Sequence, residues 1–114
     1  MSAIEDVIAE RERQKSDEGW TPTHDDAHDK GQMAGAAACY AMLGLKIQND
    51  DLRNRVANMY RDLWPWAEAW WKPKDRRRDL VRAAALLVAE IERIDRNASR
   101  HTPVFMEHGE EVPL

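Results

Sequence analysis

Residues 74–97 read KDRRRDLVRAAALLVAEIERIDRN, and this stretch decides the fold class. Its aliphatic residues recur at intervals of three and four positions with arginine and glutamate between them, a spacing typical of a helix with one apolar face. We expect this face to form the core of the protein. Its members are Leu80, Ala83, Ala84, Leu87, Val88, Ile91 and Ile94.

Two helices are predicted in the first half of the chain. A capping box of Ser2 and Glu5 opens a helix over about residues 3–16. A second helix over about residues 30–43 is dominated by alanine and glycine, and Gly44 is suited to a left-handed cap at its end. Because few of its side chains are large, another backbone can approach this second helix closely.

A third helix is predicted over about residues 49–63, and a loop bracketed by prolines follows it. No pattern of alternating residues around a tight turn indicates strands. We therefore predict an all-α fold: a small bundle of about four helices, with a tryptophan-rich loop before the last one. Residues 1–97 form a single domain in this prediction, and residues 98–114 form an irregular tail or an oligomerisation arm.

The composition of the chain argues against some classes of function. The formal net charge of −4 argues against a general nucleic-acid-binding protein, so any anion site must be local. No apolar run approaches the roughly 20 residues needed to span a bilayer, and the chain starts without a secretory leader pattern, so we expect a cytoplasmic protein. The single cysteine, Cys39, lies among alanines at helical spacing and is expected to be a core residue.

The tryptophan-rich loop, WPWAEAWWKP at residues 64–73, runs directly into a basic stretch. Basic residues in the first turn of a helix oppose its dipole, and a bound phosphate or carboxylate would relieve that repulsion. Indole rings also offer faces on which a base could stack. The predicted ligand-binding residues are Trp20, His24, Tyr40, Trp64, Trp66, Trp70, Trp71, Lys72, Arg76, Arg77 and Arg78. In the alternative interpretation, the tryptophans plug the end of the bundle and the arginines pair with Glu68, Asp75, Asp79 or acids of the first helix.

The loop GWTPTHDDAH at residues 19–28 is the second candidate site. His24 and His28 are four residues apart, so on a helix they would face one way and could hold a transition metal with Asp25 as a third ligand. The alternative is that these residues are solvated or make caps and hydrogen bonds. We predict no metal here, and these three residues are the only candidates if that is wrong.

The segments IAERERQKSDEGW (8–20), EGWTxxHDDxH (18–28) and RRRDLVRAAALLVAEIERIDR (76–96), with WPW and WWKPxDxRRxLV between them, resemble short phage- and prophage-encoded proteins. These lie on the fringe of the MazG-like all-α nucleotide pyrophosphohydrolases, and the resemblance covers roughly residues 4–96. Enzymes of that superfamily hold magnesium with several carboxylates. This chain departs from the pattern, because residues 31–43 contain no carboxylate and Asp79 is followed three residues later by Arg82.

Losing the acids while keeping a basic, aromatic site would convert a hydrolase-like scaffold into a binder. The leading hypothesis is a phage accessory protein in the host cytoplasm that binds a nucleotide or nucleotide-derived signal, without catalytic residues or cofactor, and sequesters a defence messenger such as a cyclic nucleotide or an ADP-ribose derivative. One alternative is a magnesium-dependent pyrophosphohydrolase that recruits Glu10, Glu12, Asp25, Asp26 and Asp79. The other is a helical protein-interaction module without a small ligand. We expect a homo-oligomer, because small helical bundles often pair through an Ala/Gly-rich helix.

Overall fold

The computed structural model describes residues 2–101, with side chains up to residue 99. This part of the chain is all-α, as predicted, and contains no strand. Its elements are α1 (Ala3–Asp17), α2 (Pro22–Asp26), α3 (Gln32–Met42), α4 (Asp50–Ala57), α5 (Met59–Leu63), a short 3-10 helix η1 (Glu68–Trp70) and α6 (Arg76–His101).

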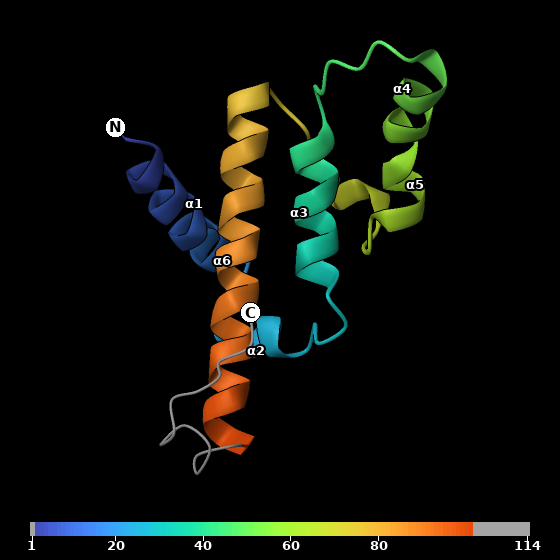
Figure 1. Cartoon of the computed structure of the whole chain (residues 1–114). Coiled ribbons are helices and arrows are strands. Elements are labelled where there is room, and N and C mark those ends of the chain that lie inside the picture. Colours follow the sequence, from blue (N-terminus) through green and yellow to red (C-terminus); the bar gives the residue numbers. More distant parts are fainter. Residues whose placement is uncertain (1, 102–114) are drawn as a thin grey trace, which may run out of the picture.

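Helix α6 is the centre of the bundle (Figure 1). It packs most extensively against α3, and α1 and α2 contact it as well, whereas α5 lies against α3 and α4 packs only against α5. The tryptophan-rich loop passes from α5 back to the start of α6. None of the described helices combines the length and apolarity needed to cross a membrane.

The predicted first and second helices are confirmed, with small differences at their ends. Ser2 and Glu5 make both hydrogen bonds of the capping box, and Gly44 has the positive φ, 79°, expected after α3. The predicted third helix is broken into α4 and α5 at Asn58, whose side-chain amide donates to the Asn54 carbonyl at 2.8 Å. Such local side-chain bonds compete with the helical pattern.

Two other boundaries differ from the prediction. Helix α2 lies inside the segment predicted as a loop, where Thr21 caps it and Pro22 occupies its first position. Helix α6 continues to His101, beyond its predicted end at about residue 97, and so includes the first residues of the predicted tail or arm. Residues 102–114, the rest of that tail or arm, lie outside the described part of the chain.

The prediction that the large aliphatic residues of the last helix form the core is wrong. Four of them are exposed: Leu80, Leu87, Ile91 and Ile94. Helix α6 instead turns Ala83, Leu86 and Ala89 toward α3, so of the predicted face Ala83 belongs to the core. The small residues of α3 leave room for these side chains, and Asp79 on α6 accepts a hydrogen bond from the Lys74 amide at 2.8 Å.

The core itself is built from small residues of α3 and α6. Its members are Met33, Ala36, Ala37, Tyr40, Ala83, Leu86 and Ala89. A Cβ placed on Gly35 would lie 3.4 Å from the Leu63 carbonyl oxygen, so α3 and α5 are in close backbone contact. The expected close packing of the Ala/Gly-rich helix is therefore confirmed within the subunit. Cys39 is buried as predicted, and burial raises the pKa of its thiol.

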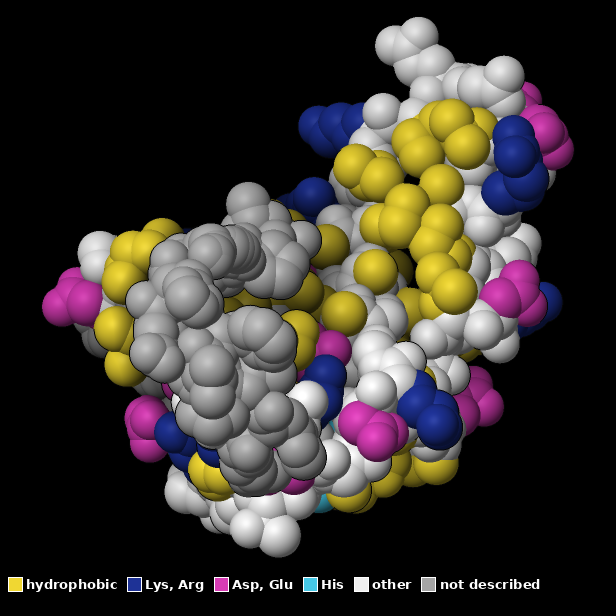
Figure 2. All heavy atoms as spheres, turned by 60° about the horizontal axis from the view of Figure 1, so that its bottom comes forward, with side chains coloured by type: hydrophobic (Ala, Val, Ile, Leu, Met, Phe, Trp, Pro, Cys, Tyr) yellow, Lys and Arg dark blue, Asp and Glu magenta, His cyan; other side chains and the backbone are white. Residues whose placement is uncertain are grey.

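Hydrophobic side chains also reach the surface over the arm formed by α4 and α5 (Figure 2). Leu52 and Leu63 are more than two-fifths exposed there. No residue of α4 is buried, which agrees with its packing against α5 alone.

Candidate functional site

Tyr40 fastens the tryptophan-rich loop to α3. Its side chain is buried, and its hydroxyl accepts a hydrogen bond from the Lys72 amide at 3.2 Å. The same hydroxyl donates a longer bond, 3.5 Å, to the Trp70 carbonyl. The Tyr40 hydroxyl therefore contacts both ends of the loop segment of residues 70–72.

Three of the four loop tryptophans are partly buried against the core, namely Trp64, Trp66 and Trp71. The ring of Trp71 lies 4.8 Å from that of Tyr40 and 5.4 Å from the parallel ring of Tyr60, measured between centroids. Trp70 differs from them because it is 45% exposed, and the Lys72 ammonium lies 5.4 Å from the centre of its ring. Only Trp70 therefore presents a large part of its ring to solvent.

Arg82 is buried beneath this segment. Its guanidinium donates to the Lys72 carbonyl and lies over the Tyr40 ring, 5.6 Å from the centroid. No carboxylate lies within ion-pair distance among the described residues, and its Nε atom has no hydrogen-bond partner there. A buried guanidinium without an anion is costly, because desolvation is not compensated.

A small cavity lies next to Arg82, and we call it the Arg82 pocket. Its lining includes Arg13, Gln14, Trp20, Tyr40, Trp70, Lys72 and Arg82. Gln14 is 1% exposed, and its Oε1 atom is a second buried polar atom without a partner. The cavity measures about 10 Å³, which is space for about one water. A larger ligand requires Trp70 and the segment around it to move outward.

Two carboxylates, Glu10 and Glu18, also line the pocket, and both are paired with arginine. Arg13 contacts Glu10 at 2.8 Å and Glu18 at 3.4 Å, and Arg78 contacts Glu10 at 2.6 Å. Burial alone would raise the pKa of Glu10, but hydrogen bonds and charge from Arg13 and Arg78 lower it below the usual value. The cations without an acidic partner at the pocket are therefore Lys72 and Arg82.

The three arginines of the predicted cluster point to separate partners. Arg76 donates to carbonyls at the end of α3, including that of Ala41 at 2.7 Å. Arg77 pairs with Asp6 at 2.6 Å, while Arg78 pairs with Glu10. Arg77 and Arg78 thus bind acids of the first helix, as in the alternative interpretation, whereas Arg76 binds backbone carbonyls, and the three side chains do not converge on one point. Their role in ligand binding stays a prediction.

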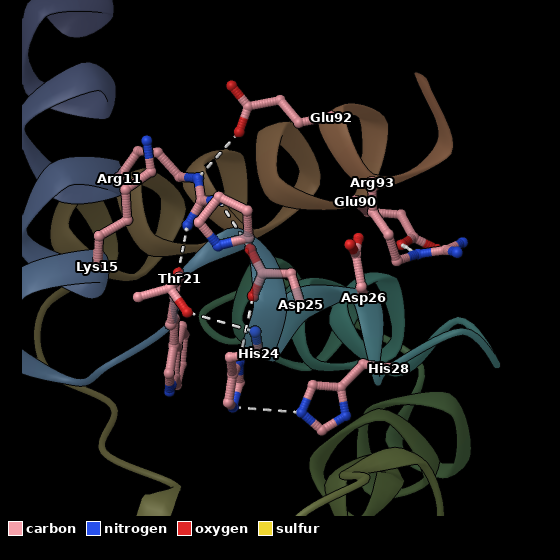
Figure 3. A network of polar contacts seen from close by, with 12 residues as sticks. Arg11, Lys15, Thr21, His24, Asp25, Asp26, His28, Glu90, Glu92 and Arg93 are labelled. Carbon is pink, nitrogen blue, oxygen red and sulfur yellow. Dashed lines mark hydrogen bonds and ion pairs between the residues drawn. The ribbon is translucent and has the colours of Figure 1, made fainter. Parts of the chain in front are cut away.

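His24 and His28 lie side by side in the lower part of the close-up (Figure 3). The two Nε2 atoms are 3.3 Å apart, and His24 Nδ1 is 3.2 Å from the Asp25 carboxylate. Trp20 stacks on His24, with 6.1 Å between the ring centroids, so this predicted ligand residue touches both the histidines and the Arg82 pocket. Burial, and secondarily the charge of His24, lowers the pKa of His28.

Asp25 has a charged partner other than the histidines. It is fully buried and pairs with Arg11 at 2.7 Å, and Arg11 also reaches Glu92 at 3.2 Å (Figure 3). Its neighbour Asp26 pairs with Arg96 at 2.8 Å. Among the described residues, no three His, Cys, Asp or Glu side chains are grouped so that they could hold a metal ion.

The carboxylates of the enzyme alternative are likewise bound one by one. Glu12 contacts Lys15 at 3.2 Å, and Glu10, Asp25, Asp26 and Asp79 have the separate partners given above. The structure does not bring these five acids together.

The sequence reasoning missed Arg82 and Gln14 as site residues. Arg82 looked like a residue on the polar side of the last helix, because the larger aliphatic residues pointed the core elsewhere. A signal was present, since Asp79, Arg82, Leu86 and Ala89 share one helical face that also carries alanines. Of the predicted ligand residues, the structure gathers Trp20, Tyr40, Trp70 and Lys72 at the Arg82 pocket.

Comparisons with protein-family models, with curated proteins and with solved structures gave no match.

Proposed function

We propose that the protein binds a nucleotide or nucleotide-derived signal, with phosphate held by Arg82 and Lys72. The observation that carries this proposal is the buried guanidinium of Arg82, which has no carboxylate partner in the described structure and one unsatisfied donor. An oxyanion would supply both the missing charge and the missing acceptor. Lys72, on the loop above, would contact the same anion from the solvent side.

Aromatic rings around this point suit a flat group attached to the phosphate. Trp70 is exposed at the mouth, Tyr40 forms the floor, and Trp20 lies at the side of the Arg82 pocket. Stacking of a base on an aromatic side chain contributes on the order of 1–3 kcal/mol. In this proposal the ligand displaces Trp70 outward and occupies the enlarged Arg82 pocket.

The proposal is for a binder rather than a hydrolase. Hydrolysis of a nucleotide by the magnesium route needs grouped carboxylates, whereas the five acids of the enzyme alternative contact separate arginine, lysine or backbone amide partners. In a phage-encoded protein, binding without turnover would serve to sequester a defence messenger such as a cyclic nucleotide or an ADP-ribose derivative.

The test is a thermal-shift screen of the full chain against cyclic nucleotides, ADP-ribose, common nucleotides and inorganic phosphate, with mass spectrometry of what the heat-denatured protein releases. A ligand at a hundred times its Kd stabilises the folded protein by about 2.7 kcal/mol. We expect such a shift with at least one nucleotide-class ligand. No shift with any of them, and no nucleotide released, would overturn the proposal.

Three variants test whether the ligand binds at Arg82 and Lys72. Arg82→Met and Lys72→Met should abolish or strongly reduce the ligand-induced shift, whereas Arg55→Met, on the exposed face of α4, should bind like the wild type. Arg82→Met also has a readout without ligand, because removing a buried unpaired charge should leave the free protein as stable as the wild type or more stable. A ligand shift retained in Arg82→Met would move the site elsewhere.

A protein-interaction function remains the second candidate, and a separate observation favours it. The described structure exposes large aliphatic residues along one helix.

A further inference from the structure

The outward face of α6 is strongly apolar. Leu80, Leu87, Ile91 and Ile94 are 41%, 45%, 57% and 50% exposed. The opposite face of the same helix packs against α3 and α1, so α6 has apolar residues on two sides, and among the described residues only that opposite face is packed within the subunit. Soluble monomers seldom leave a contiguous stripe of this kind open to water.

The exposed residues follow a seven-residue repeat. With Ala84 and Ala98, they occupy positions 80, 84, 87, 91, 94 and 98, which alternate by four and three as in the seam of a coiled coil. The stripe is straight and narrow and runs for roughly 27 Å along the helix. Such a seam fits another helix with the same repeat.

We propose that this seam is the interface of a homodimer in which the α6 helices of two copies lie antiparallel. Centred between Leu87 and Ile91, this arrangement sets Leu87 against Ile91 of the partner subunit, Ala84 against the partner's Ile94, and Leu80 against the partner's Ala98. Every outer layer then pairs a large side chain with a small one, which fills space evenly.

The parallel arrangement fits less well. It would stack each residue on its own copy, so Ala84 would meet alanine and leave a void, while Ile94 would meet isoleucine. It would also bring Glu90 beside Asp95 of the partner subunit, with like charges facing across the seam. The large and small residues of this stripe are therefore complementary to a second copy only when the helices run in opposite directions.

This interface differs from the one expected from the sequence. The Ala/Gly-rich α3 was expected to mediate pairing, but its small residues are used inside the subunit against α6 and α5. The α6 seam also faces away from Arg82, so the dimer does not depend on the proposed anion site.

The first test is the mass of the full chain in solution, measured by sedimentation equilibrium over a wide range of concentrations. We expect a dimer for the wild type, and Leu87→Asp and Ile91→Asp should each weaken dimerisation by roughly a hundredfold or more, since each places two carboxylates in an apolar seam. Leu52→Asp on α4 is the matched control, because Leu52 is 41% exposed and lies outside the seam. Circular dichroism checks that the variants remain helical.

The second test fixes the direction of the helices. Under mild oxidation, the double variant Ala84→Cys, Ile94→Cys should form a covalent dimer, whereas each single variant should crosslink no more than the wild type with its buried Cys39. Efficient crosslinking of either single variant would show a parallel pair and overturn the antiparallel arrangement. A wild type that is monomeric at all concentrations, or a dimer unaffected by Leu87→Asp and Ile91→Asp, would overturn the interface itself. In the monomeric case, protection of Ile91→Cys from thiol labelling would show that residues 102–114 occupy the seam.

Discussion

Replacing Asp25 by asparagine tests whether the Arg11–Asp25 pair holds the lower end of the bundle together. The two side chains are 4% and 1% exposed, and the nitrogen and oxygen lie 2.7 Å apart. Asparagine keeps the shape of the side chain but removes its charge, so the guanidinium of Arg11 stays buried with little compensation. Breaking a buried pair by removing one partner typically costs about 3–5 kcal/mol.

The structure places this variant at the lower end of that range. Arg11 retains a bond to Glu92 at 3.2 Å and another to the Trp20 carbonyl at 3.2 Å, although the Glu92 side chain is 44% exposed. We therefore expect a loss of about 3 kcal/mol in the free energy of unfolding. With a typical urea dependence of about 2 kcal/mol per molar, this lowers the unfolding midpoint by roughly 1.5 M.

Urea unfolding followed by circular dichroism measures this loss. Asp51→Asn is the control, because Asp51 and Arg55 form an ion pair on the surface with side chains 81% and 68% exposed, and such pairs contribute less than about 1 kcal/mol. Adding Arg11→Met to Asp25→Asn removes the stranded charge, so the double variant should be more stable than Asp25→Asn alone. The reasoning fails if Asp25→Asn costs no more than Asp51→Asn, or if the double variant is the least stable of the set.

Two further predictions concern single positions. Gly44→Ala and Gly19→Ala both place alanine at positive φ, which costs roughly 1–2 kcal/mol. Only at Gly44 does the new Cβ also lie 3.0 Å from Arg76 Cδ. Thermal unfolding should therefore show the larger loss of stability for Gly44→Ala, and equal losses would contradict the close approach. The folded-state pKa of His28 lies below the ordinary value of about 6.5, so the unfolded chain takes up the proton first as pH falls. The stability of the folded protein should therefore fall as pH drops below about 6.5 and level off below the folded-state pKa. His28→Gln should reduce this fall between about pH 7.5 and pH 5.5 relative to the wild type, as measured by urea midpoints, and an identical fall in both proteins would assign it to other groups.

The helices were predictable because their signals are local. The capping box at Ser2 and the glycine after α3 act within a few residues, and both appear in the structure as expected. The start of α2 was marked in the same way by Thr21 and Pro22, a cap followed by a residue favoured at the first position, and this signal was passed over. Local sequence signals were therefore sufficient to predict the start of α2, although the prediction did not use them.

The buried face of α6 was not predictable from periodicity. Leu86 and Leu87 are neighbours in a helix with apolar residues on both sides, and the pattern favoured the side with the larger residues. The structure buries Leu86 because α3 offers a surface of small residues. It can also bury Arg82 on this face, because the guanidinium donates to the Lys72 carbonyl and lies over the Tyr40 ring. These contacts join segments far apart in the chain, so no local pattern contains them.

The candidate site was predictable in its residue types but not in its partners. Aromatic and basic residues do meet at the tryptophan-rich loop, as the composition of that stretch indicated. The acids of α1 determine which cation has no acidic partner in the described structure. They pair with Arg77 and Arg78, and Arg82 is left without a carboxylate partner. The pairing is a property of how α1 crosses α6, and sequence spacing carries no information about that crossing.

Helix α2 has a consequence for hydrogen exchange. A helix of five residues has almost no stability of its own, and its two aspartates reach in different directions, Asp25 to α1 and Asp26 to α6. Its amides should therefore be protected only while both long helices are docked, and local fraying cannot expose them without breaking a buried pair. The five-residue helix α2 should thus exchange as slowly as the central helix, and its amides should report the opening of the whole bundle.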